Sequence, residues 1–315
     1  MSATEDQTPS VESLTVVIPN WETPDYTVKS AQALIADGVP ANRVVVVENG
    51  SDDDSAERLA RGLPECRLVV LEQNIGYASA ANAGAEALGG DAYLVVNNDA
   101  FVHRPGSVTT MLAAIGRDRT GIVVPRLLNE DGSLQPTVKP IDRPVVAFVR
   151  ASGLSRFVPN RWQPRWSTHW DHARSREIHA ADGAVMLVRG DAWNALGGFS
   201  RNTYMYAEDT DICWRAAELG WRVWFESGAE FVHLGNATAS LRWSNPERAE
   251  RWSRAEAHLV TERLSRPAGV VSILITAAGL AARAALFRLT GQRERSASHL
   301  AQLRGYLSAL RPASR

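Results

Sequence analysis

Short apolar, β-branched runs alternate with helical segments through the first hundred residues, and this alternation restricts the fold more than any other feature. The runs predict strands over residues 14–18, 43–47, 67–71 and 92–96. The segments between them predict helices over residues 26–37, 55–61 and 77–88. Pro19 is expected to end the first strand because it lacks an N–H. Such alternation is typical of an α/β fold with a mostly parallel sheet flanked by helices, in which ligands bind beyond the carboxyl ends of the strands.

The alternation stops near residue 135. Residues 135–179 are rich in proline, arginine and tryptophan and show little periodicity, so we expect a long loop or lid there. Regular patterns return as a strand over 184–188, helices over 191–196 and 209–219, and short strands over 222–225 and 230–233. After Pro246 the chain is expected to be helical to its end.

The composition excludes several classes of protein. The chain has 315 residues, 45% of them apolar, which is enough for one large core or two smaller ones. Lys+Arg 34 against Asp+Glu 35 gives a net charge of −1, so no overall field attracts nucleic acid and no nucleic-acid partner is expected. The two cysteines indicate a reducing compartment, and the polar residues 1–10 do not resemble a signal peptide. We therefore expect a cytoplasmic protein.

Three carboxylates stand within four positions, at Glu208, Asp209 and Asp211, where a helix is expected to begin. Mutual repulsion makes such crowding costly unless a cation or a transferable proton is near. Capping of the helix explains one of the three acids but does not readily explain all of them. Arg215, one helical turn after Asp211, is expected to neutralise it.

Polar residues also end two of the apolar runs. Asn97, Asn98 and Asp99 follow one run, and His233 ends another. An aspartate and a histidine at strand ends can form an open site for a divalent metal, since hard cations prefer oxygen ligands and often bridge a diphosphate. The plainer interpretations are an Asx turn and a satisfied buried histidine, and on the residues alone both stay open.

Two further turns could contact a nucleotide. In the first, around Gly50, a carboxylate and an amide could read the edge of a base, or the turn could simply cap the helix expected at Ser55. The second opens a helix with small residues from Asn74 to Gly84, which suits either a diphosphate at the helix N-terminus or close packing on the sheet.

Seven short motifs in a fixed order join these features. They are Asn20-Trp21, Glu48-Asn49-Gly50-Ser51, Asn74-Ile75-Gly76-Tyr77-Ala78, Asn97-Asn98-Asp99, Gly197-Gly198-Phe199, Tyr206-Ala207-Glu208-Asp209-Thr210-Asp211 and Phe231 to Thr238. The whole series resembles the inverting glycosyltransferases of family 2, and most closely their bacterial rhamnosyltransferase-like branch, over about residues 14–240. Two positions depart from the family pattern: Glu48 replaces the usual Asp, and Asn97 replaces the first Asp of the metal motif.

The resemblance implies a GT-A fold, which is Rossmann-like, with a helical C-terminal extension. Residues 1–12 would form a disordered tail and residues 13–243 the catalytic domain, whose nucleotide-binding half ends near residue 125 and whose acceptor-binding half follows. Residues 244–315 would form the helical region. The donor-binding residues would be Pro19, Asn20, Trp21, Glu48, Asn49, Gly50, Ser51, Asn74, Gly76, Tyr77, Asn82, Asn97, Asn98 and Asp99.

The resemblance also implies a mechanism. A divalent metal, Mg²⁺ or Mn²⁺, would be held by Asp99, His233 and the diphosphate of a nucleoside diphosphate sugar. Asp209 would be the general base, with Glu208 and Asp211 as supports. The segment that lines the sugar and acceptor pocket would be Asp182-Gly183-Ala184.

The substrates remain alternatives at this stage. The expected donor is dTDP-rhamnose and the expected acceptor a hydroxyl of a lipid-linked or cell-envelope glycan, such as a polyprenyl diphosphate sugar. The alternatives are a galactofuranosyl- or other hexosyltransferase that uses a UDP-sugar, and a non-catalytic nucleotide-sugar-binding scaffold. A nucleotidyltransferase would need a glycine-rich loop with Arg and Lys after the first strand, which Asn20-Trp21-Glu22-Thr23-Pro24 does not supply.

The C-terminal region carries a membrane signal. Residues 268–282 are uncharged, and about 15 residues are short for a span, which needs ~20. We expect a helix in the membrane interface, peripheral at the inner face of the plasma membrane, with arginines facing anionic headgroups. The alternative is a helix packed on the core or on a second subunit of a homo-oligomer. The residues in question are Arg283, Arg288, Arg293 and Arg295, and Trp162, Trp166 and Trp170 form either an interfacial anchor or a lid.

Overall fold

The computed structural model of the protein describes residues 8–162, 170–201, 205–235 and 244–310. The chain divides into two compact units. The first, here called the sheet unit, comprises Met1–Val138, Asp171–Tyr204 and Glu208–Thr238. The second, here called the helical unit, comprises Lys139–Trp170, Met205–Ala207 and Ala239–Arg315. The division therefore differs from the expected one, because residues 139–170 belong with the C-terminal helices.

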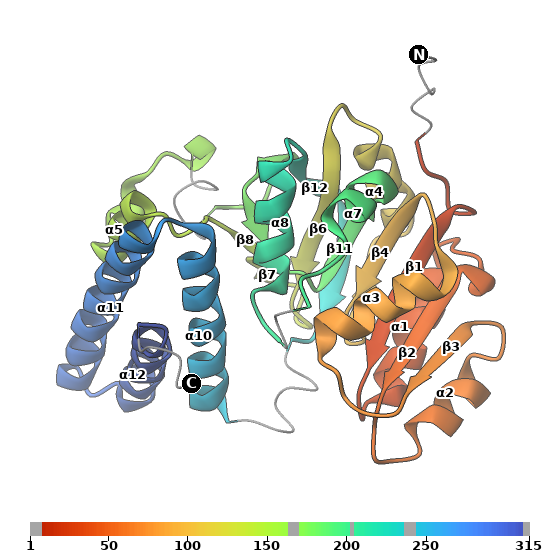
Figure 1. Ribbon diagram of the computed structural model, residues 1–315, viewed down its shortest axis with the longest axis horizontal. Coiled ribbons are helices and arrows are strands. Elements are labelled where there is room, and N and C mark those ends of the chain that lie inside the picture. The colour runs from red at the N-terminus through yellow and green to blue at the C-terminus, as the bar shows by residue number, and fades with distance from the viewer. Residues whose placement is uncertain (1–7, 163–169, 202–204, 236–243, 311–315) are drawn as a thin grey trace. The chain divides into compact units, whose positions relative to one another are not determined.

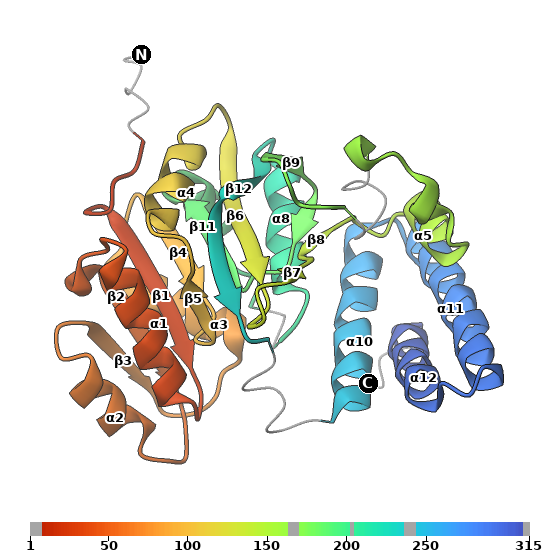
Figure 2. The ribbon, with the colours of Figure 1, turned by 180° about the vertical axis from the view of Figure 1, so that it is seen from behind.

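The first half of the sheet unit has the predicted alternation. Its four strands are parallel in the order β3-β2-β1-β4, as Figures 1 and 2 show. They are β1 (Leu14–Asn20), β2 (Val44–Asn49), β3 (Arg67–Leu71) and β4 (Ala92–Val96), and the helices between them are α1 (Pro24–Ala36), α2 (Ser55–Gly62) and α3 (Tyr77–Leu88). Every residue of β1, β2 and β4 is buried, which is why these strands read as continuous apolar runs.

Pro19 does not end the first strand. β1 continues through Pro19 and Asn20, which pair with Val47 and Glu48 of β2. The register with the other neighbour, β4, stops earlier, at Val17. The missing N–H of Pro19 is thus tolerated because the strand has only one partner at this level.

The second half of the sheet is mixed. β11 (Val185–Arg189) runs antiparallel between β4 and β6 (Thr120–Leu128), and β12 (Arg222–His233) runs parallel to β6. β5 (Ala100–Val102) pairs antiparallel with the end of β12. Because β11 runs against its neighbours, the residues just before it lie at the same edge as the carboxyl ends of β1, β2, β4, β6 and β12. This edge therefore collects residues from distant parts of the sequence.

Two sequence expectations for this half need correction. The short strands expected over 222–225 and 230–233 are one strand, β12, with a register shift between Glu226 and Glu230 that accommodates Ser227, Gly228 and Ala229. The expected loop over 135–179 holds regular elements, which are β7 (Leu134–Gln135), β8 (Val138–Lys139), α5 (Pro144–Ala151), 3-10 turns at Leu154–Phe157 and Asn160–Trp162, and β9 (Arg176–Ile178). β7 pairs with β6, β9 pairs with β12, and β8 pairs with β10 (Ala180–Ala181).

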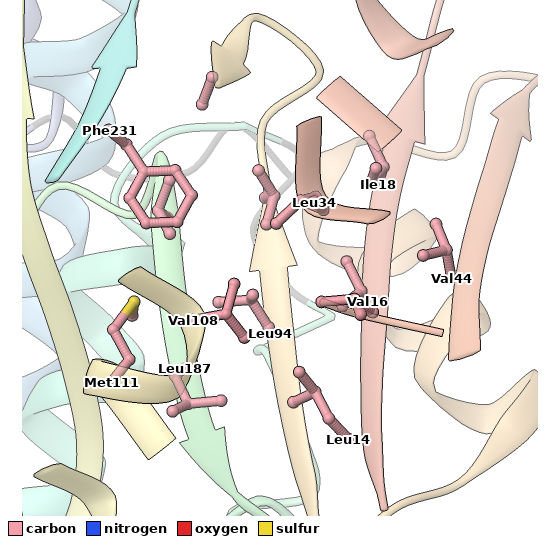
Figure 3. Packing of buried hydrophobic residues seen from close by; sticks show 14 of the residues in the cluster. Leu14, Val16, Ile18, Leu34, Val44, Leu94, Val108, Met111, Leu187 and Phe231 are labelled. Atoms are coloured by element: carbon pink, nitrogen blue, oxygen red, sulfur yellow. The ribbon is translucent and has the colours of Figure 1, made fainter. Parts of the chain in front are cut away.

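The main core fills one face of the sheet (Figure 3). Side chains of β1 and β4 meet Leu34 of α1 and Val108 and Met111 of α4 (Ser107–Ile115) there, in one buried cluster. The opposite face is covered by α3, α7 (Gly190–Leu196) and α8 (Glu208–Glu218), which stand in front of the sheet in Figure 1. Both faces of the central strands are therefore covered, and the carboxyl ends of these strands are where a site can form.

The helical unit confirms that the chain after Pro246 is mainly helical as far as Ser308, and residues 311–315 lie outside the described residues. It contains α10 (Asn245–Arg263), α11 (Arg266–Leu289) and α12 (Arg293–Ser308), with α5 packed against α11. Ser244 and Glu247 form a capping box at the start of α10. A small apolar core, of Ala257, Ile273, Leu280 and Tyr306, joins the three long helices.

α11 is long and apolar enough to cross a membrane by length and composition, and 33% of its most apolar window is buried in the protein. Arg283 does not point away from the unit, since its Nη1 donates to the carbonyl oxygens of Arg150 and Ala151 at 3.4 Å. The tryptophans do not form one exposed row either: Trp162 is exposed, Trp170 is buried, and Trp166 lies outside the described residues.

Candidate active site

A buried carboxylate organises the end of β2. Glu48 is 2% exposed, and its Oε2 accepts a hydrogen bond from Asn20 Nδ2 at the end of β1. Its Oε1 accepts from the backbone N–H of Ser51 at 2.7 Å. The extra methylene relative to aspartate lets one side chain reach both groups. Glu48 therefore holds together two of the predicted donor motifs.

The turn after β2 is bound to the loop before α3. Asn49 Nδ2 donates to Asn74 Oδ1 at 3.2 Å, and the N–H of Ile75 donates to Asn49 Oδ1 at 3.0 Å. Gly50 has a φ of +65°, and a Cβ there would lie 2.2 Å from the carbonyl carbon of Gln73. Only glycine fits this position, so the two motifs, 25 residues apart, form one structure.

Trp21 and Glu22 follow β1 and join the same turn. The N–H of Glu22 donates to Ser51 Oγ at 2.9 Å. Glu22 has a φ of +56°, which is unusual for a residue with a side chain. This geometry gives Glu22, for which the sequence offered no role, a place in the turn that surrounds Ser51.

Asp99 and His233 come together as predicted. β5 follows Asp99 directly and pairs with the end of β12, so that Ala100 lies opposite His233. Asp99 Oδ1 is 3.2 Å from His233 Nε2, and Asn97 Nδ2 is 3.4 Å from the same nitrogen. Among the described residues no group of three His, Cys, Asp or Glu side chains could hold a metal ion.

This pair fits a divalent metal whose other ligands come from the substrate. Asp99 is 4% exposed, and one of its carboxylate oxygens faces an imidazole nitrogen. A carboxylate and an imidazole suit Mn²⁺ or Mg²⁺, and such ions commonly keep positions for phosphate oxygens. Asp99 and His233 would thus supply two ligands and a diphosphate others.

Asp209 is held by main-chain groups. Its Oδ2 accepts from the N–H of Gly183 at 2.9 Å, and its Oδ1 accepts from the N–H of Thr210 at 2.6 Å. A Cβ at Gly183 would lie 2.8 Å from the Cβ of Asp209, so the close approach requires glycine. The next residue, Ala184, accepts a hydrogen bond from the N–H of Asn97 at 2.7 Å. The predicted base, acceptor segment and metal motif therefore meet at one edge of the sheet.

Tyr77 lies where these groups converge. Its hydroxyl is buried, and none of the described residues offers it a hydrogen-bond partner. Burial raises the pKa of Tyr77 well above its usual value, and the negative charges of Glu208, Asp209 and Asp99 raise the pKa further. A buried phenol near these carboxylates, with no hydrogen-bond partner among the described residues, is suited to donate to a ligand.

The backbone before Glu208 is strained. Tyr206 and Ala207 have φ values of +72° and +64°, consecutive left-handed conformations in residues with side chains. Such conformations cost of order 1–3 kcal/mol each and tend to occur where function requires a particular geometry. They direct the chain into α8, which begins at Glu208.

Three further predicted site residues are also bound to protein groups. Asp211 pairs with Arg215 at 2.7 Å, as expected, and both Oδ1 and Nδ2 of Asn82 bond to the backbone of Phe199, at 2.9 and 2.8 Å. Asn98 Nδ2 donates to Thr23 Oγ1 at 2.7 Å. These contacts fix the elements around the site.

The sequence reasoning missed Gln135, whose Oε1 lies 2.7 Å from His233 Nδ1. Gln135 fell within the segment expected to be a loop. The dipeptide Asp131-Gly132, a common hairpin turn, could have indicated the β6–β7 hairpin that presents it.

Comparisons with known proteins find a matching family, related sequences and similar structures. The model of the family described as "Glycosyl transferase family 2" matches residues 15–196. An N-acetylglucosaminyl-diphospho-decaprenol L-rhamnosyltransferase of Mycobacterium tuberculosis is 29% identical over 202 residues, which are 60% of this chain and 66% of that protein.

Solved structures share the fold. A mannosyltransferase from Pyrobaculum calidifontis, in complex with GDP-Man and Mn²⁺, has a TM-score of 0.56 at 16% identity and covers 96% of this chain and 89% of its own. Residues 1–349 of TarS from S. aureus, in complex with UDP-GlcNAc, have a TM-score of 0.53 at 16% identity, with 95% and 82% covered. The α/β fold with its helical C-terminal region is thus that of GT-A glycosyltransferases.

Proposed function

Because the chain belongs to glycosyltransferase family 2, we propose that it is a metal-dependent inverting glycosyltransferase that moves L-rhamnose from dTDP-rhamnose to a hydroxyl of a lipid-linked or cell-envelope glycan. One observation carries the proposal. The Asp99–His233 pair and Asp209 lie at the same sheet edge, joined through the Asn97–Ala184 hydrogen bond of 2.7 Å. A metal-held diphosphate and a general base would thus flank one anomeric carbon.

Similar proteins support the choice of substrates. The Mycobacterium relative is named for L-rhamnosyl transfer to a diphospho-decaprenol sugar, and the chain covers slightly less than two thirds of its length. The Pyrobaculum neighbour is in complex with a nucleotide sugar and Mn²⁺. Asn49 and Glu48, at the end of β2, are where the base would bind, and Tyr77 would donate to the diphosphate or the sugar.

The transfer would proceed by a single displacement. The oxygen of the acceptor hydroxyl forms a bond to the anomeric carbon from the face opposite the leaving group, and Asp209 accepts the proton of that hydroxyl. The bond from that carbon to the diphosphate oxygen breaks, and its electron pair leaves with the nucleotide. Asp99 and His233 would hold a divalent cation, which would supply positive charge for the departing diphosphate. The Gly183 and Thr210 N–H groups keep the carboxylate of Asp209 in place.

Calorimetric titration with four donors tests the proposal. With Mn²⁺ present, dTDP-rhamnose is expected to bind more tightly than UDP-galactofuranose, UDP-GlcNAc or GDP-mannose, and Asp99→Ala is expected to abolish that binding. Preference for a UDP-sugar would favour the hexosyltransferase alternative. Binding without hydrolysis or transfer to any acceptor would favour a scaffold.

A lipid-linked acceptor is supported by the surface of the helical unit. Large apolar side chains on one side of α11 are exposed, namely Val271, Leu274, Leu286 and Leu289. The exposed residues between Leu274 and Leu286 are alanines, so this side of the helix is apolar and suits the boundary between headgroups and acyl chains; they are Ala278, Ala281, Ala282 and Ala285. We propose that this face rests on the inner surface of the plasma membrane.

Vesicle co-sedimentation tests this contact with the full chain. Leu274→Glu is expected to weaken binding to anionic vesicles, because it places a charge in the apolar face. Leu219→Glu changes an equally exposed leucine beyond α8 and serves as the matched control. The alternative outcome is that the wild-type chain self-associates without binding vesicles and that Leu274→Glu dissociates it. That result would identify the face as a subunit interface.

A further inference from the structure

We propose that Gln135 is a positioning residue that fixes His233 in the tautomer with its proton on Nδ1, so that the lone pair of Nε2 faces Asp99. The inference rests on the proposed function, since it concerns a ligand of the metal site proposed above. Gln135 touches no substrate atom in this scheme. It would act only through the imidazole of His233.

The amide of Gln135 has a defined partner for each of its polar atoms. Its Oε1 lies 2.7 Å from His233 Nδ1. Its Nε2 donates to the backbone carbonyl oxygen of His233 at 3.2 Å and to Asn129 Oδ1 at 3.0 Å. A carbonyl oxygen can only accept a hydrogen bond, so the nitrogen of the amide must be the atom that faces it. The oxygen of the amide is then directed at Nδ1, which must carry the proton.

A second amide gives the same orientation independently. Asn129 Nδ2 donates to the carbonyl oxygen of Leu134 at 3.4 Å and to Ser133 Oγ at 2.9 Å. Ser133 gives its own hydroxyl proton to Asp131 Oδ1 at 2.6 Å, so its oxygen is the acceptor for Asn129. Asn129 Oδ1 is therefore turned toward Gln135, where it meets a donor. Two backbone carbonyls and one carboxylate thus determine the proton position on His233.

The β6–β7 hairpin places Gln135 beside β12. Its turn is closed by the N–H of Asn129, which donates to the carbonyl of Ser133 at 2.8 Å, and Gln135 lies opposite Leu127 of β6. Leu127 also pairs with Phe231 of β12, two residues before His233. The hairpin that carries Gln135 is thus paired, through β6, with β12, the strand that carries His233.

The tautomer decides what Nε2 can do. With the proton on Nδ1, Nε2 is an acceptor, and Asn97 Nδ2 at 3.4 Å is placed to donate to it. Asp99 Oδ1, at 3.2 Å, is a second acceptor facing the same nitrogen. Two acceptors in contact repel each other until a cation lies between them. Hydrogen bonds of this kind to the distal nitrogen of a metal-binding histidine commonly raise metal affinity 10- to 100-fold.

Nitrogen-15 NMR of the metal-free full chain tests the proton position directly. With ¹⁵N-labelled histidine and assignment by comparison with His233→Gln, the His233 ring is expected to show a protonated Nδ1 and an unprotonated Nε2 at mildly alkaline pH. A ring with its proton mainly on Nε2 would overturn the inference. This measurement needs neither metal nor substrate and no variant of Gln135.

Mn²⁺ binding tests the consequence. In the presence of dTDP or UDP, Gln135→Leu is expected to weaken Mn²⁺ binding about 10- to 100-fold. Gln32→Leu makes the same chemical change on the exposed surface of α1 and should leave the affinity unchanged. Equal affinities for folded Gln135→Leu and wild type would contradict the role of Gln135.

The two tests separate this inference from the proposed function. If the wild type shows the Nδ1 tautomer but binds no Mn²⁺ with either nucleotide, the metal-dependent function fails while the orientation of His233 stands. If Mn²⁺ binds and His233 carries its proton on Nε2, the function stands and the role of Gln135 is wrong.

Discussion

Both units of this protein contain buried carboxylates, but the groups that contact those carboxylates differ between the units. In the sheet unit, Asp99 and Asp209 lie at the ends of elements, where their neighbours are a histidine and main-chain N–H groups. In the helical unit, Glu256 pairs with Lys139 at 3.2 Å, and both side chains are 11% exposed. Asp142 pairs with Arg150 in the same unit. Burial of a carboxylate is thus common to both, and only its partners distinguish a site from a structural ion pair.

Two tyrosines show the contrast at single residues. Burial raises the pKa of both Tyr77 and Tyr306, and nearby carboxylates raise each further. At Tyr306 the cations Arg150 and Lys139 oppose this effect. At Tyr77 the charges that act among the described residues are all negative. The surroundings of Tyr77 therefore have the electrostatics of a site that a cation would complete, whereas the surroundings of Tyr306 already contain cations.

The largest expected effect is on turnover. Asp209→Asn removes the proposed base, so kcat is expected to fall on the order of 10²–10⁴-fold. The amide keeps one oxygen acceptor, so the free energy of unfolding should fall by only about 1 kcal/mol. Asp191→Asn, at an exposed position on α7, is the control for both measurements. Turnover near the wild-type rate in folded Asp209→Asn would place the base elsewhere.

A carboxylate of the helical unit should behave in the opposite way. Glu256→Gln leaves Lys139 buried without its counter-charge, and denaturant unfolding is expected to show a loss of about 3 kcal/mol. Donor affinity measured on the folded protein should not change. Glu250→Gln, on the same helix, breaks more exposed pairs with Arg254 and Arg304 and should cost less than about 1 kcal/mol. A loss of donor binding in folded Glu256→Gln would show that the carboxylates of the helical unit are not purely structural.

The smallest effect concerns the Tyr77 hydroxyl. Tyr77→Phe removes a buried polar group that the described residues leave unpaired, so the ligand-free protein is expected to gain about 1 kcal/mol of stability. Donor affinity should fall about tenfold at the same time, because the substrate loses a hydrogen bond. Tyr26→Phe, on the partly exposed side of α1, should change neither quantity. A destabilised Tyr77→Phe would show that the hydroxyl is satisfied within the protein.

Much of the sheet unit could be predicted because its strands form short apolar runs, and β1, β2 and β4 are buried throughout. β3, α3 and β4 begin and end at the predicted residues. The antiparallel course of β11 could not be read from its apolar run, since strand direction depends on the partners it meets. Nor could the expected loop after residue 135 reveal α5, which is stabilised by packing on α11.

The site shows the same limit at the level of side chains. The motifs predicted where the turns lie and that Asp99 is near His233. The spacing of residues in the sequence does not specify which atoms form hydrogen bonds. Asn82 is among the expected donor-binding residues, yet its amide is bound to Phe199, 117 residues away. Gln135 matches no motif and still contacts His233. The ligand-binding roles that the family resemblance implies for the site residues therefore stay predictions.

The contact between Gly183 and Asp209 affects which substitutions the site can accept during evolution. The hydrogen bond that orients Asp209 is donated by the peptide N–H of Gly183, so it does not depend on which side chains surround the pocket. The one requirement is the absence of a side chain at position 183. Drift in the surrounding pocket can therefore alter which sugar or hydroxyl is accepted while the orientation of the proposed base is inherited intact.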